Sequence, residues 1–540
     1  APIAGQVLES PVASGITYRE LVLQSRALVH SAPDSAEALL THLADSWPES
    51  GEVWLLLAQA RRAASEPRAS IPSFERAISL GAIDSASGAY EIAVAYAQLG
   101  EADSAVAWIE QSLASGYRWR PDILEDQSLA PIGQTQLQRL SGMADDSIDR
   151  IEGWRGDLAF LVGEVRRVHW QYRRAPLPAE FELQRRRVSE DLGAWSDARV
   201  VMELQRLLAT LHDGHTLVYP FGMDRGEQSW LPLSTYWFDD GLYVIEAEDP
   251  GIVGSKVTGI GKMTVQETMQ ELDSWTSHMN PSGFRAMAPV YLTFSDLLVA
   301  LGAVDSDRMV EMTLFDGTRE RTVTIEARPI DVDRLRMKLF PPSGQTAPLW
   351  LNRVEDPYWM QSIDQGLVYV QVNQAVDDEE EPMGEFADRI LGTLMGPSTL
   401  GLVLDLRHNN GGDAVHIVPL VRMITTWRRQ LPEKSFYVLI GRTTFSAAQT
   451  LVNELEIYAD PTFVGEPTAS PPSRFGNEAS FRLPWSGVIG SISAGYNQGW
   501  SSRDARIWTE PDIPTTLTSG AYFAGRDPAL EAILELERGP

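Results

Sequence analysis

Apolar residues in the first quarter of the chain recur at the three- and four-residue spacing of helices that bury one face. These segments occur in pairs, at 51–64 with 73–82 and at 87–100 with 101–116. In each pair a bulky aromatic near the front of the first segment, Trp54 or Tyr90, precedes several alanines. Small residues let two helices approach closely, so the pattern predicts helix–turn–helix units stacked in series.

The second pair begins roughly 34–36 residues after the first, a period typical of tetratricopeptide repeats. We therefore expect a tetratricopeptide-like helical module over residues 1–145. Such a module either packs against the rest of the chain or offers a concave surface to a peptide or protein partner, and the sequence leaves both roles open.

The pattern changes twice after this module. Residues 146–225 keep helical spacing and form a helical block that contains the motif LHDGHT. Between 226 and 330, short alternating or β-branched segments such as LYVIEA, MVEMTLFDG and RTVTIEA lie between glycines and aspartates, with two helical segments among them. This composition predicts a small β-rich domain.

Strands and helices alternate within residues 331–540. The segments QGLVYVQVNQ, TLGLVLDLR and SFYVLIG have the composition of buried strands, and a helical segment follows each of them. This alternation predicts an α/β layer with largely parallel strands, whose reactive groups lie where strands end and helices begin. The fold class we expect is multidomain: a helical repeat module, a helical block, a small β-rich domain and an α/β core.

Composition narrows the possible functions. The 540 residues exceed one ordinary core, and 45 basic against 74 acidic side chains give a net charge of −29, which disfavours binding to nucleic acid and to anionic membranes. The absence of cysteine excludes disulfides, thiolate nucleophiles and Cys-ligated zinc. No apolar run approaches the ~20 residues that span a bilayer. The chain begins APIAGQV, from which we expect a trimmed mature end and export to the periplasm or the cell exterior.

Ser446 lies in IGRTTFSAAQTL, where a β-branched strand ends and a helix begins. A hydroxyl at this position is exposed beside backbone N–H groups that lack a helical partner and can stabilise an oxyanion, as acyl transfer requires. A serine at a helix start also commonly caps the helix. The local pattern therefore leaves nucleophile and cap as alternatives.

A second loop, RHNNGGD, joins another buried strand to a helix through Gly411 and Gly412. Paired glycines allow positive φ angles and close approach of a substrate, and their N–H groups can complete an anion site. Together the two loops predict a nucleophile and an oxyanion pocket on neighbouring strand ends.

The search for a general base is short, because the chain has 8 histidines. His215 lies in LHDGHT, where a helix ends through an Asp-Gly pair, so its imidazole stands on a connection rather than on a packed face. Metal binding by His212, Asp213 and His215, or by His408 and His416 around the glycine loop, is disfavoured because no HExxH-type spacing occurs.

The motifs LHDGHT, LVLDLRHNNGGD, LIGRTTFSAAQTL, FVGEPT and EPDIP with GRDPAL follow in the order and approximate spacing of the tail-specific, or C-terminal-processing, protease family, which the chain resembles from about 149 to 537. The resemblance implies a crotonase-like core over 331–540, a PDZ-like identity for the β-rich domain, and cofactor-free peptide hydrolysis through an acyl-enzyme. It also implies Ser446 as nucleophile, with the region of Gly411 and Gly412 and the Ala447 N–H as oxyanion donors.

One motif departs from this family. The processing proteases carry a lysine base a few residues after the GE dipeptide, whereas this chain reads GEPTASPPSRFGN with Pro471 in that place. The chain therefore looks more like the tricorn-type branch, which uses a histidine from the segment corresponding to LHDGH, and also like the modules of interphotoreceptor retinoid-binding protein. This resemblance makes His215 the favoured base.

A histidine base needs an acidic acceptor on its second nitrogen, to fix the tautomer and support the imidazolium. Glu466, directly after a strand, is the preferred candidate over Asp504, which lies in a poorly matching segment. Either acid has the alternative of an ordinary pairing with an arginine such as Arg407 or Arg506.

The sequence as a whole predicts a serine peptidase that acts on peptides or proteins without a cofactor or a metal. Two alternatives stay open: an esterase or small-peptide hydrolase at the same site, and a ligand-binding protein of the retinoid-binding type in which the catalytic residues are vestigial.

Overall fold

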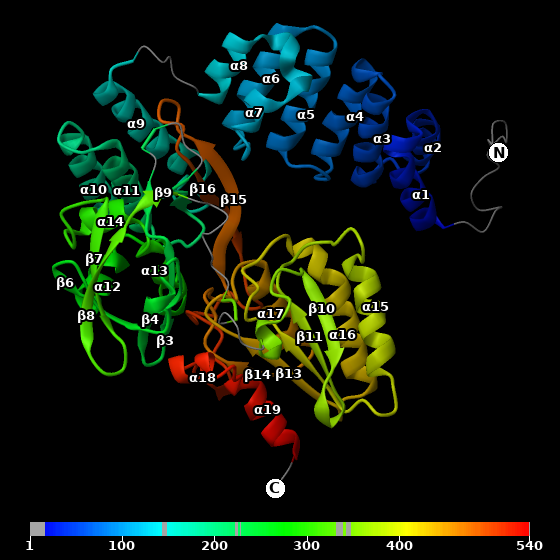
Figure 1. Cartoon of the computed structure of the whole chain (residues 1–540). Coiled ribbons are helices and arrows are strands. Elements are labelled where there is room, and N and C mark those ends of the chain that lie inside the picture. Colours follow the sequence, from blue (N-terminus) through cyan, green and yellow to red (C-terminus); the bar gives the residue numbers. More distant parts are fainter. Residues whose placement is uncertain are drawn as a thin grey trace. The chain divides into compact units, whose positions relative to one another are not determined.

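The computed structural model describes residues 17–142, 148–221, 225–226, 228–330, 339–341 and 347–538 (Figure 1). The chain forms two compact units, residues 1–168 with 479–485 and residues 169–478 with 486–540. The chain start interpreted as a trimmed mature end lies outside the described residues, and so do residues 145, 146 and 331 at two predicted domain boundaries. The four predicted domain ranges stay predictions.

The first unit is a series of helices, coloured blue to cyan in Figure 1. They are α1 (Tyr18–Ser31), α2 (Pro33–Ser46), α3 (Gly51–Ala63), α4 (Pro67–Ser79), α5 (Ser85–Gln98), α6 (Ala102–Ala114), α7 (Asp122–Glu125), α8 (Gln134–Ser141) and α9 (Arg150–Val168). Ser50 and Asp84 cap α3 and α5 by accepting from N–H groups of the first turn. Ala58 and Ala95 are fully buried with Phe74, so small side chains do allow close helix packing. The two predicted helix pairs are confirmed, and their tetratricopeptide identity stays a prediction.

The second unit begins with α10 (Ala179–Asp191) and α11 (Asp197–Ala209) and continues into an antiparallel sheet of order β3-β4-β5-β7-β8. The strands are β3 (Leu233–Phe238), β4 (Gly241–Ala247), β5 (Lys256–Ile260), β7 (Met309–Phe315) and β8 (Glu320–Glu326), and the helices among them are α12 (Val265–Asp273), α13 (Pro281–Tyr291) and α14 (Ser295–Leu301). The β-rich character and two of the helices were predicted. Helix α13 was not, because its Pro-Ser-Gly start and internal proline are typical of a loop.

A six-stranded sheet of order β10-β11-β12-β13-β14-β17 forms the centre of the second unit. Its strands are β10 (Tyr358–Ser362), β11 (Leu367–Val372), β12 (Gly401–Asp405), β13 (Ser435–Ile440), β14 (Thr462–Gly465) and β17 (Ile513–Pro514). All neighbours from β11 to β17 are parallel, which confirms the predicted α/β layer, and β10 pairs antiparallel with β11.

Both faces of this sheet are covered. Helices α15 (Met383–Leu394), α16 (Val418–Gln430) and α17 (Ala447–Tyr458) cover one face, and α19 (Pro528–Arg538) packs on the other. Along β12, Leu402 and Leu404 contribute to the first core and Val403 to the second, because successive side chains point to opposite faces. Burial on both faces explains why the strands are continuous apolar runs.

A third sheet, of order β1-β16-β15, contains two long strands that the sequence analysis did not predict. Its strands are β1 (Leu217–Val218), β15 (Arg474–Arg482) and β16 (Ile489–Asn497). The start of β15 follows the GEPTASPPS segment and carries side chains to the site described below. In the described part of the chain, no helix combines the length and apolarity that crossing a bilayer requires.

Candidate active site

Ser446 is the residue immediately before α17, and its backbone is strained. Its φ and ψ angles are 55° and −118°, outside the extended region that N-cap residues adopt, and its side chain makes no capping hydrogen bond. Such a conformation costs of order 1–3 kcal/mol in a non-glycine residue and persists only where the surroundings impose it. The cap alternative is therefore excluded: Ser446 is a partly exposed residue whose hydroxyl does not bond to the helix.

The loop that carries Ser446, residues 441–446, is hydrogen-bonded along its length to the glycine loop, residues 406–412. The Thr444 hydroxyl donates to the Leu406 carbonyl at 3.0 Å, and the Thr443 hydroxyl donates to the Arg407 carbonyl. The Phe445 N–H donates to the Asn409 carbonyl at 3.1 Å. The structure thus brings the two predicted loops together, because β12 and β13 are parallel neighbours whose carboxyl ends meet at one edge.

Gly411 lies directly against Ser446. A Cβ atom added at Gly411 would lie 2.8 Å from Ser446 Cβ and 3.4 Å from the Ala447 nitrogen, and its φ of 122° disfavours any L side chain. The Gly411 N–H donates to Asn409 Oδ1 at 3.0 Å, whereas the Gly412 and Ala447 N–H groups have no acceptor among the described residues. Of the three residues expected to donate to the oxyanion, Gly412 and Ala447 therefore each have an available N–H group.

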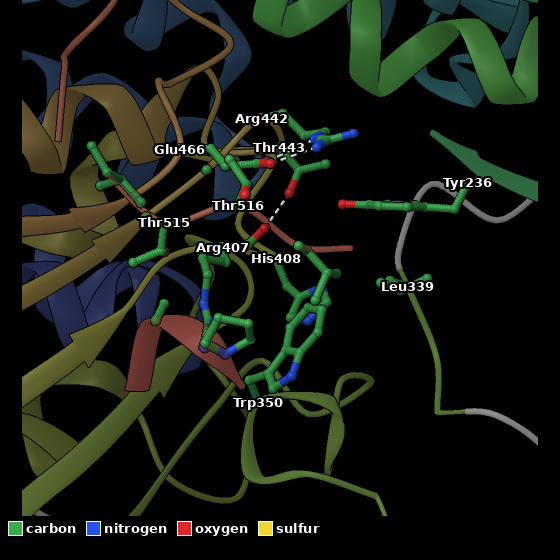
Figure 2. Close-up of a pocket in the computed structure, with 16 residues that line it drawn as sticks. Tyr236, Leu339, Trp350, Arg407, His408, Arg442, Thr443, Glu466, Thr515 and Thr516 are labelled. Atoms are coloured by element: carbon green, nitrogen blue, oxygen red, sulfur yellow. Dashed lines mark hydrogen bonds and ion pairs between the residues drawn. The ribbon is translucent and has the colours of Figure 1, made fainter. Parts of the chain in front are cut away.

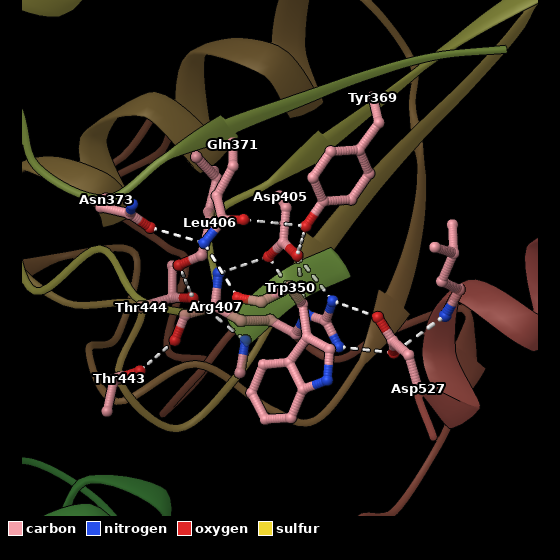
Figure 3. A network of polar contacts seen from close by, with 12 residues as sticks. Trp350, Tyr369, Gln371, Asn373, Asp405, Leu406, Arg407, Thr443, Thr444 and Asp527 are labelled. Carbon is pink, nitrogen blue, oxygen red and sulfur yellow. Dashed lines mark hydrogen bonds and ion pairs between the residues drawn. The ribbon is translucent and has the colours of Figure 1, made fainter. Parts of the chain in front are cut away.

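Arg407 anchors the base of the glycine loop through a buried network (Figure 3). Its guanidinium donates to Asp405 at 2.6 Å and to Asp527 at 2.8 and 2.9 Å, and the Tyr369 hydroxyl donates to Asp405 at 2.5 Å. Burial by itself would raise the pKa of Asp405, but Arg407 and Tyr369 hold that pKa below its usual value. The charged state of the network is thus stabilised, and the loop that follows β12 is fixed.

His215 is buried, 3% exposed, and its ring stacks on Phe445 with centroids 4.3 Å apart. The structure therefore places the predicted base against the residue that precedes Ser446. Neither ring nitrogen makes a hydrogen bond to another described residue, and catalytic contacts are often open before substrate binds. Burial lowers the pKa of His215, with Arg474 acting in the same direction and Glu478 and Asp213 opposing it, so the neutral, base-competent form is favoured.

Two acids face His215. Glu478 Oε1 lies 3.4 Å from Nε2, and Asp213 Oδ1 lies 4.0 Å from Nδ1. Asp213 is fully buried and accepts hydrogen bonds from the Thr216 hydroxyl at 2.6 Å and from the backbone N–H of His215 at 3.1 Å. His169 Nε2 lies 3.4 Å from Asp213 Oδ2, and His169 Nδ1 accepts hydrogen bonds from two backbone N–H groups.

The structure brings neither Glu466 nor Asp504 to His215. The Glu466 carboxylate accepts hydrogen bonds from Arg442 Nε and Nη2 at 2.7 and 2.5 Å. Burial raises the pKa of Glu466, but the Arg442 guanidinium more than offsets this effect, so the pKa is lowered. Asp504 is paired with Arg506 at 2.7 Å. Both acids have thus taken the alternative role of arginine partner.

The Arg442–Glu466 pair borders a cavity of about 60 Å³ at the carboxyl ends of the parallel strands (Figure 2). Tyr236, Trp350 and His408 also line it, and the Trp350 and His408 rings are stacked. Ser446 and His215 lie outside its lining. The cavity is therefore separate from the Ser446 site, although the same strand ends build both.

The described residues contain no cluster of three or more His, Cys, Asp or Glu side chains arranged to hold a metal ion. His212 lies 3.4 Å from Glu180, and His416 lies 3.6 Å from Asp377.

Glu478 and Arg474 are the site residues that the sequence analysis missed. Both lie on β15, Arg474 as its first residue and Glu478 in its middle, and the signal available for them was the alternation of RFGNEASFR, which predicts a strand. No pattern within one strand indicates that one of its residues meets a histidine some 260 positions earlier in the chain, as the 3.4 Å Glu478–His215 contact shows.

No known family model matches the chain, and no curated protein matches it in sequence. Solved structures do match. The structure of mature CPAF complexed with lactacystin aligns with a TM-score of 0.53 and 14% identity, over 72% of this chain and 98% of that one. A crystal structure of mature CPAF aligns with a TM-score of 0.50 and 14% identity, over 72% and 97% of the two chains. Over about 72% of its length, the chain therefore shares its fold with mature CPAF.

Proposed function

We propose that the chain is a serine peptidase of the tail-specific kind, in which Ser446 attacks a peptide carbonyl and forms an acyl-enzyme. The observation that carries the proposal is the conformation of Ser446: its backbone is strained and its hydroxyl does not cap α17. A serine kept in this conformation offers its hydroxyl to another molecule rather than to its own helix. The fold shared with mature CPAF and the motif order are consistent with this reading.

His215 is the general base in this proposal, and Glu478 replaces Glu466 and Asp504 as its acidic partner. The imidazole is buried against Phe445 and its pKa is lowered, so it is neutral near pH 7 and able to take the Ser446 proton. Glu478 lies 3.4 Å from Nε2, close enough to stabilise the imidazolium that forms.

The oxyanion of the tetrahedral intermediate is held by the Ala447 and Gly412 N–H groups. Both donors are without an acceptor in the described structure, and they lie on the two loops that meet at Ser446. Gly411 contributes space rather than a donor, because its N–H is engaged by Asn409. As the intermediate collapses, the peptide C–N bond breaks and His215 gives its proton to the leaving amine. Water then gives a proton to His215 and attacks the ester, and the Ser446 oxygen takes that proton as the acyl group is released.

The rest of the chain fits this activity as follows. The parallel sheet with its covering helices serves as a crotonase-like core, and the antiparallel sheet from β3 to β8 as a PDZ-like domain. The helical first unit is a tetratricopeptide-like module that recruits a peptide or protein partner. Peptides or proteins are the substrate class. The alternative activity at the same site is hydrolysis of esters or small peptides.

A fluorophosphonate probe tests the nucleophile. We expect the parent protein to be labelled and Ser446→Ala to lose labelling without a loss of stability, because that hydroxyl caps nothing. The matched control is Ser196→Ala, in which a true N-cap is removed, since Ser196 Oγ accepts from the Arg199 N–H at 3.2 Å. This control should lose about 1 kcal/mol of stability and keep its labelling. Absence of labelling in the folded parent, beside a labelled control hydrolase, would favour the ligand-binding alternative.

A further inference from the structure

The segment that lacks the expected lysine, residues 467–474, runs along the loop that carries Ser446, residues 441–446, and binds it at several points. The Ala469 N–H donates to the Thr444 carbonyl at 3.1 Å, and the Ser446 N–H donates to Ser470 Oγ at 3.2 Å. The Pro472 carbonyl accepts from Asn453 in α17 at 2.9 Å. The segment is thus a fixed part of the site.

Arg474 ends this segment and reaches the nucleophile itself. Its Nη2 donates to the Ser446 carbonyl and, at 2.6 Å, to the Thr450 hydroxyl, and its Nη1 donates to the Pro472 carbonyl at 3.4 Å. Both sides of the Ser446 backbone are therefore held from one segment, the N–H by Ser470 and the carbonyl by Arg474, which adds to the helical bond from the Thr450 N–H at 3.2 Å.

The electrostatic setting of Arg474 is unfavourable for stability. The side chain is 4% exposed and forms no ion pair among the described residues, and burial lowers its pKa to about 10 although the charge of Glu478 acts in the opposite direction. It also places positive charge at the N-terminal end of α17, where the helix dipole is already positive. A buried charge that forms no ion pair costs free energy, so a neutral donor would hold the carbonyl at lower cost. The charge therefore points to a role in the chemistry.

The peptide group that Arg474 binds is the one that carries the oxyanion donor. The Ser446 carbonyl and the Ala447 N–H belong to a single planar trans peptide, so fixing the oxygen on one side fixes the direction of the N–H on the other. A charge-assisted bond to the carbonyl also polarises the peptide and strengthens its N–H as a donor.

We propose that Arg474 is a positioning residue that orients and polarises the Ser446–Ala447 peptide, so that the Ala447 N–H is held ready for the oxyanion. This inference rests on the proposed function. In a chain that lacks the lysine base, the same segment supplies a cation that acts through the backbone of the nucleophile and takes no proton from it.

The charge of Arg474 also acts on the proposed base. The charged groups that face His215 are Glu478 and Asp213, which stabilise its protonated form, and Arg474, which destabilises it. Removing the arginine charge therefore raises the pKa of His215, and the acidic limb of the rate profile moves to higher pH.

The test compares Arg474→Gln and Arg474→Lys by fluorophosphonate labelling rate, peptide kinetics and pH profile, using the full chain. Loss of an oriented oxyanion donor lowers acylation by roughly 10²-fold. We expect Arg474→Gln to lose about that factor in kcat with KM nearly unchanged, to keep or gain thermal stability, and to shift its acidic limb upward. The lysine variant should recover part of the rate and leave the limb near its parental position.

Two further variants separate this role from a structural one. Thr450→Val removes the second acceptor of Arg474 Nη2 and should give a smaller loss in kcat. Arg428→Gln is the matched control, because Arg428 also binds backbone carbonyls, including that of Ala459 at 3.0 Å at the far end of α17. It should lower thermal stability and leave labelling unchanged.

Parental kcat and an unshifted pH profile in a folded Arg474→Gln protein would overturn the inference, as would a labelling loss that only follows unfolding. If Arg474→Gln does not fold, Thr450→Val and the lysine variant decide in the same way. A folded parent protein that is not labelled at Ser446 refutes the proposed function instead.

Discussion

Gly411→Ala probes how tightly the glycine loop packs against Ser446, the proposed nucleophile. The new methyl group would lie 2.8 Å from Ser446 Cβ and 3.3 Å from Ser446 Oγ, closer than side-chain carbons approach in folded proteins. Since the normal separation of two such carbons is roughly 3.5–4 Å, one of the loops must shift by about 1 Å. The φ of 122° adds backbone strain of about 1–3 kcal/mol.

A displacement of that size at a reacting atom costs about 10²-fold in rate, or roughly 2.7 kcal/mol of transition-state stabilisation. We therefore expect Gly411→Ala to remain folded and to fall by about that factor in kcat/KM and in the second-order rate of fluorophosphonate labelling. Urea denaturation of the same samples measures the strain as a loss of about 1–3 kcal/mol in unfolding free energy.

Gly392→Ala is the matched control, because Gly392 lies within α15 and an added Cβ meets nothing within 4 Å. It should gain about 0.5–1 kcal/mol of stability and keep the parental rate. Parental turnover by Gly411→Ala with unchanged stability would refute the packing of the glycine loop on Ser446.

Three further predictions concern charged groups. Glu478→Gln removes a charge that raises the pKa of His215, so the acidic limb of kcat/KM should move to lower pH, and an upward move would contradict the assignment. Arg442→Gln leaves the mostly buried Glu466 carboxylate without its partner and should cost about 3–5 kcal/mol of unfolding free energy in urea. Glu466→Gln should leave the acidic limb of kcat/KM in place. A shift of that limb in Glu466→Gln would restore Glu466 as the partner of the base. Asp405 has a lowered pKa in the folded chain, so its stabilising contribution is present above about pH 3.9 and lost as pH falls through the folded value; urea midpoints of Asp405→Asn should therefore vary less between pH 5 and pH 2 than those of the parent.

Local sequence patterns identified the elements of the core and the two loops at its edge. The strands β11 to β13 are apolar runs because both of their faces are buried, and a run of that kind is visible in the sequence without any tertiary information. Ser446, Gly411 and Gly412 follow two of these strands, and parallel neighbours place their carboxyl ends at one edge. His215 could be singled out because few histidines exist and this one stands at the end of a helix.

The contact between His215 and Glu478 was decided by the tertiary structure alone. Glu466 follows a strand of the sheet and was the preferred candidate, yet its carboxylate meets Arg442, while Glu478 reaches the imidazole from a strand of another sheet. A strand pattern shows which side chains share a face, but the partner that each face meets depends on how the sheets are joined.

The sequence by itself determined that a serine stands where β13 gives way to α17, because strand and helix periods differ and the change is local. Only the tertiary structure decided that this serine does not cap its helix. Its φ of 55° is imposed by Gly411 packed behind it, by Ser470 on its N–H and by Arg474 on its carbonyl, contacts from segments some 24 to 35 residues away. Backbone strain of this kind is a product of surrounding packing, and no local sequence preference encodes it.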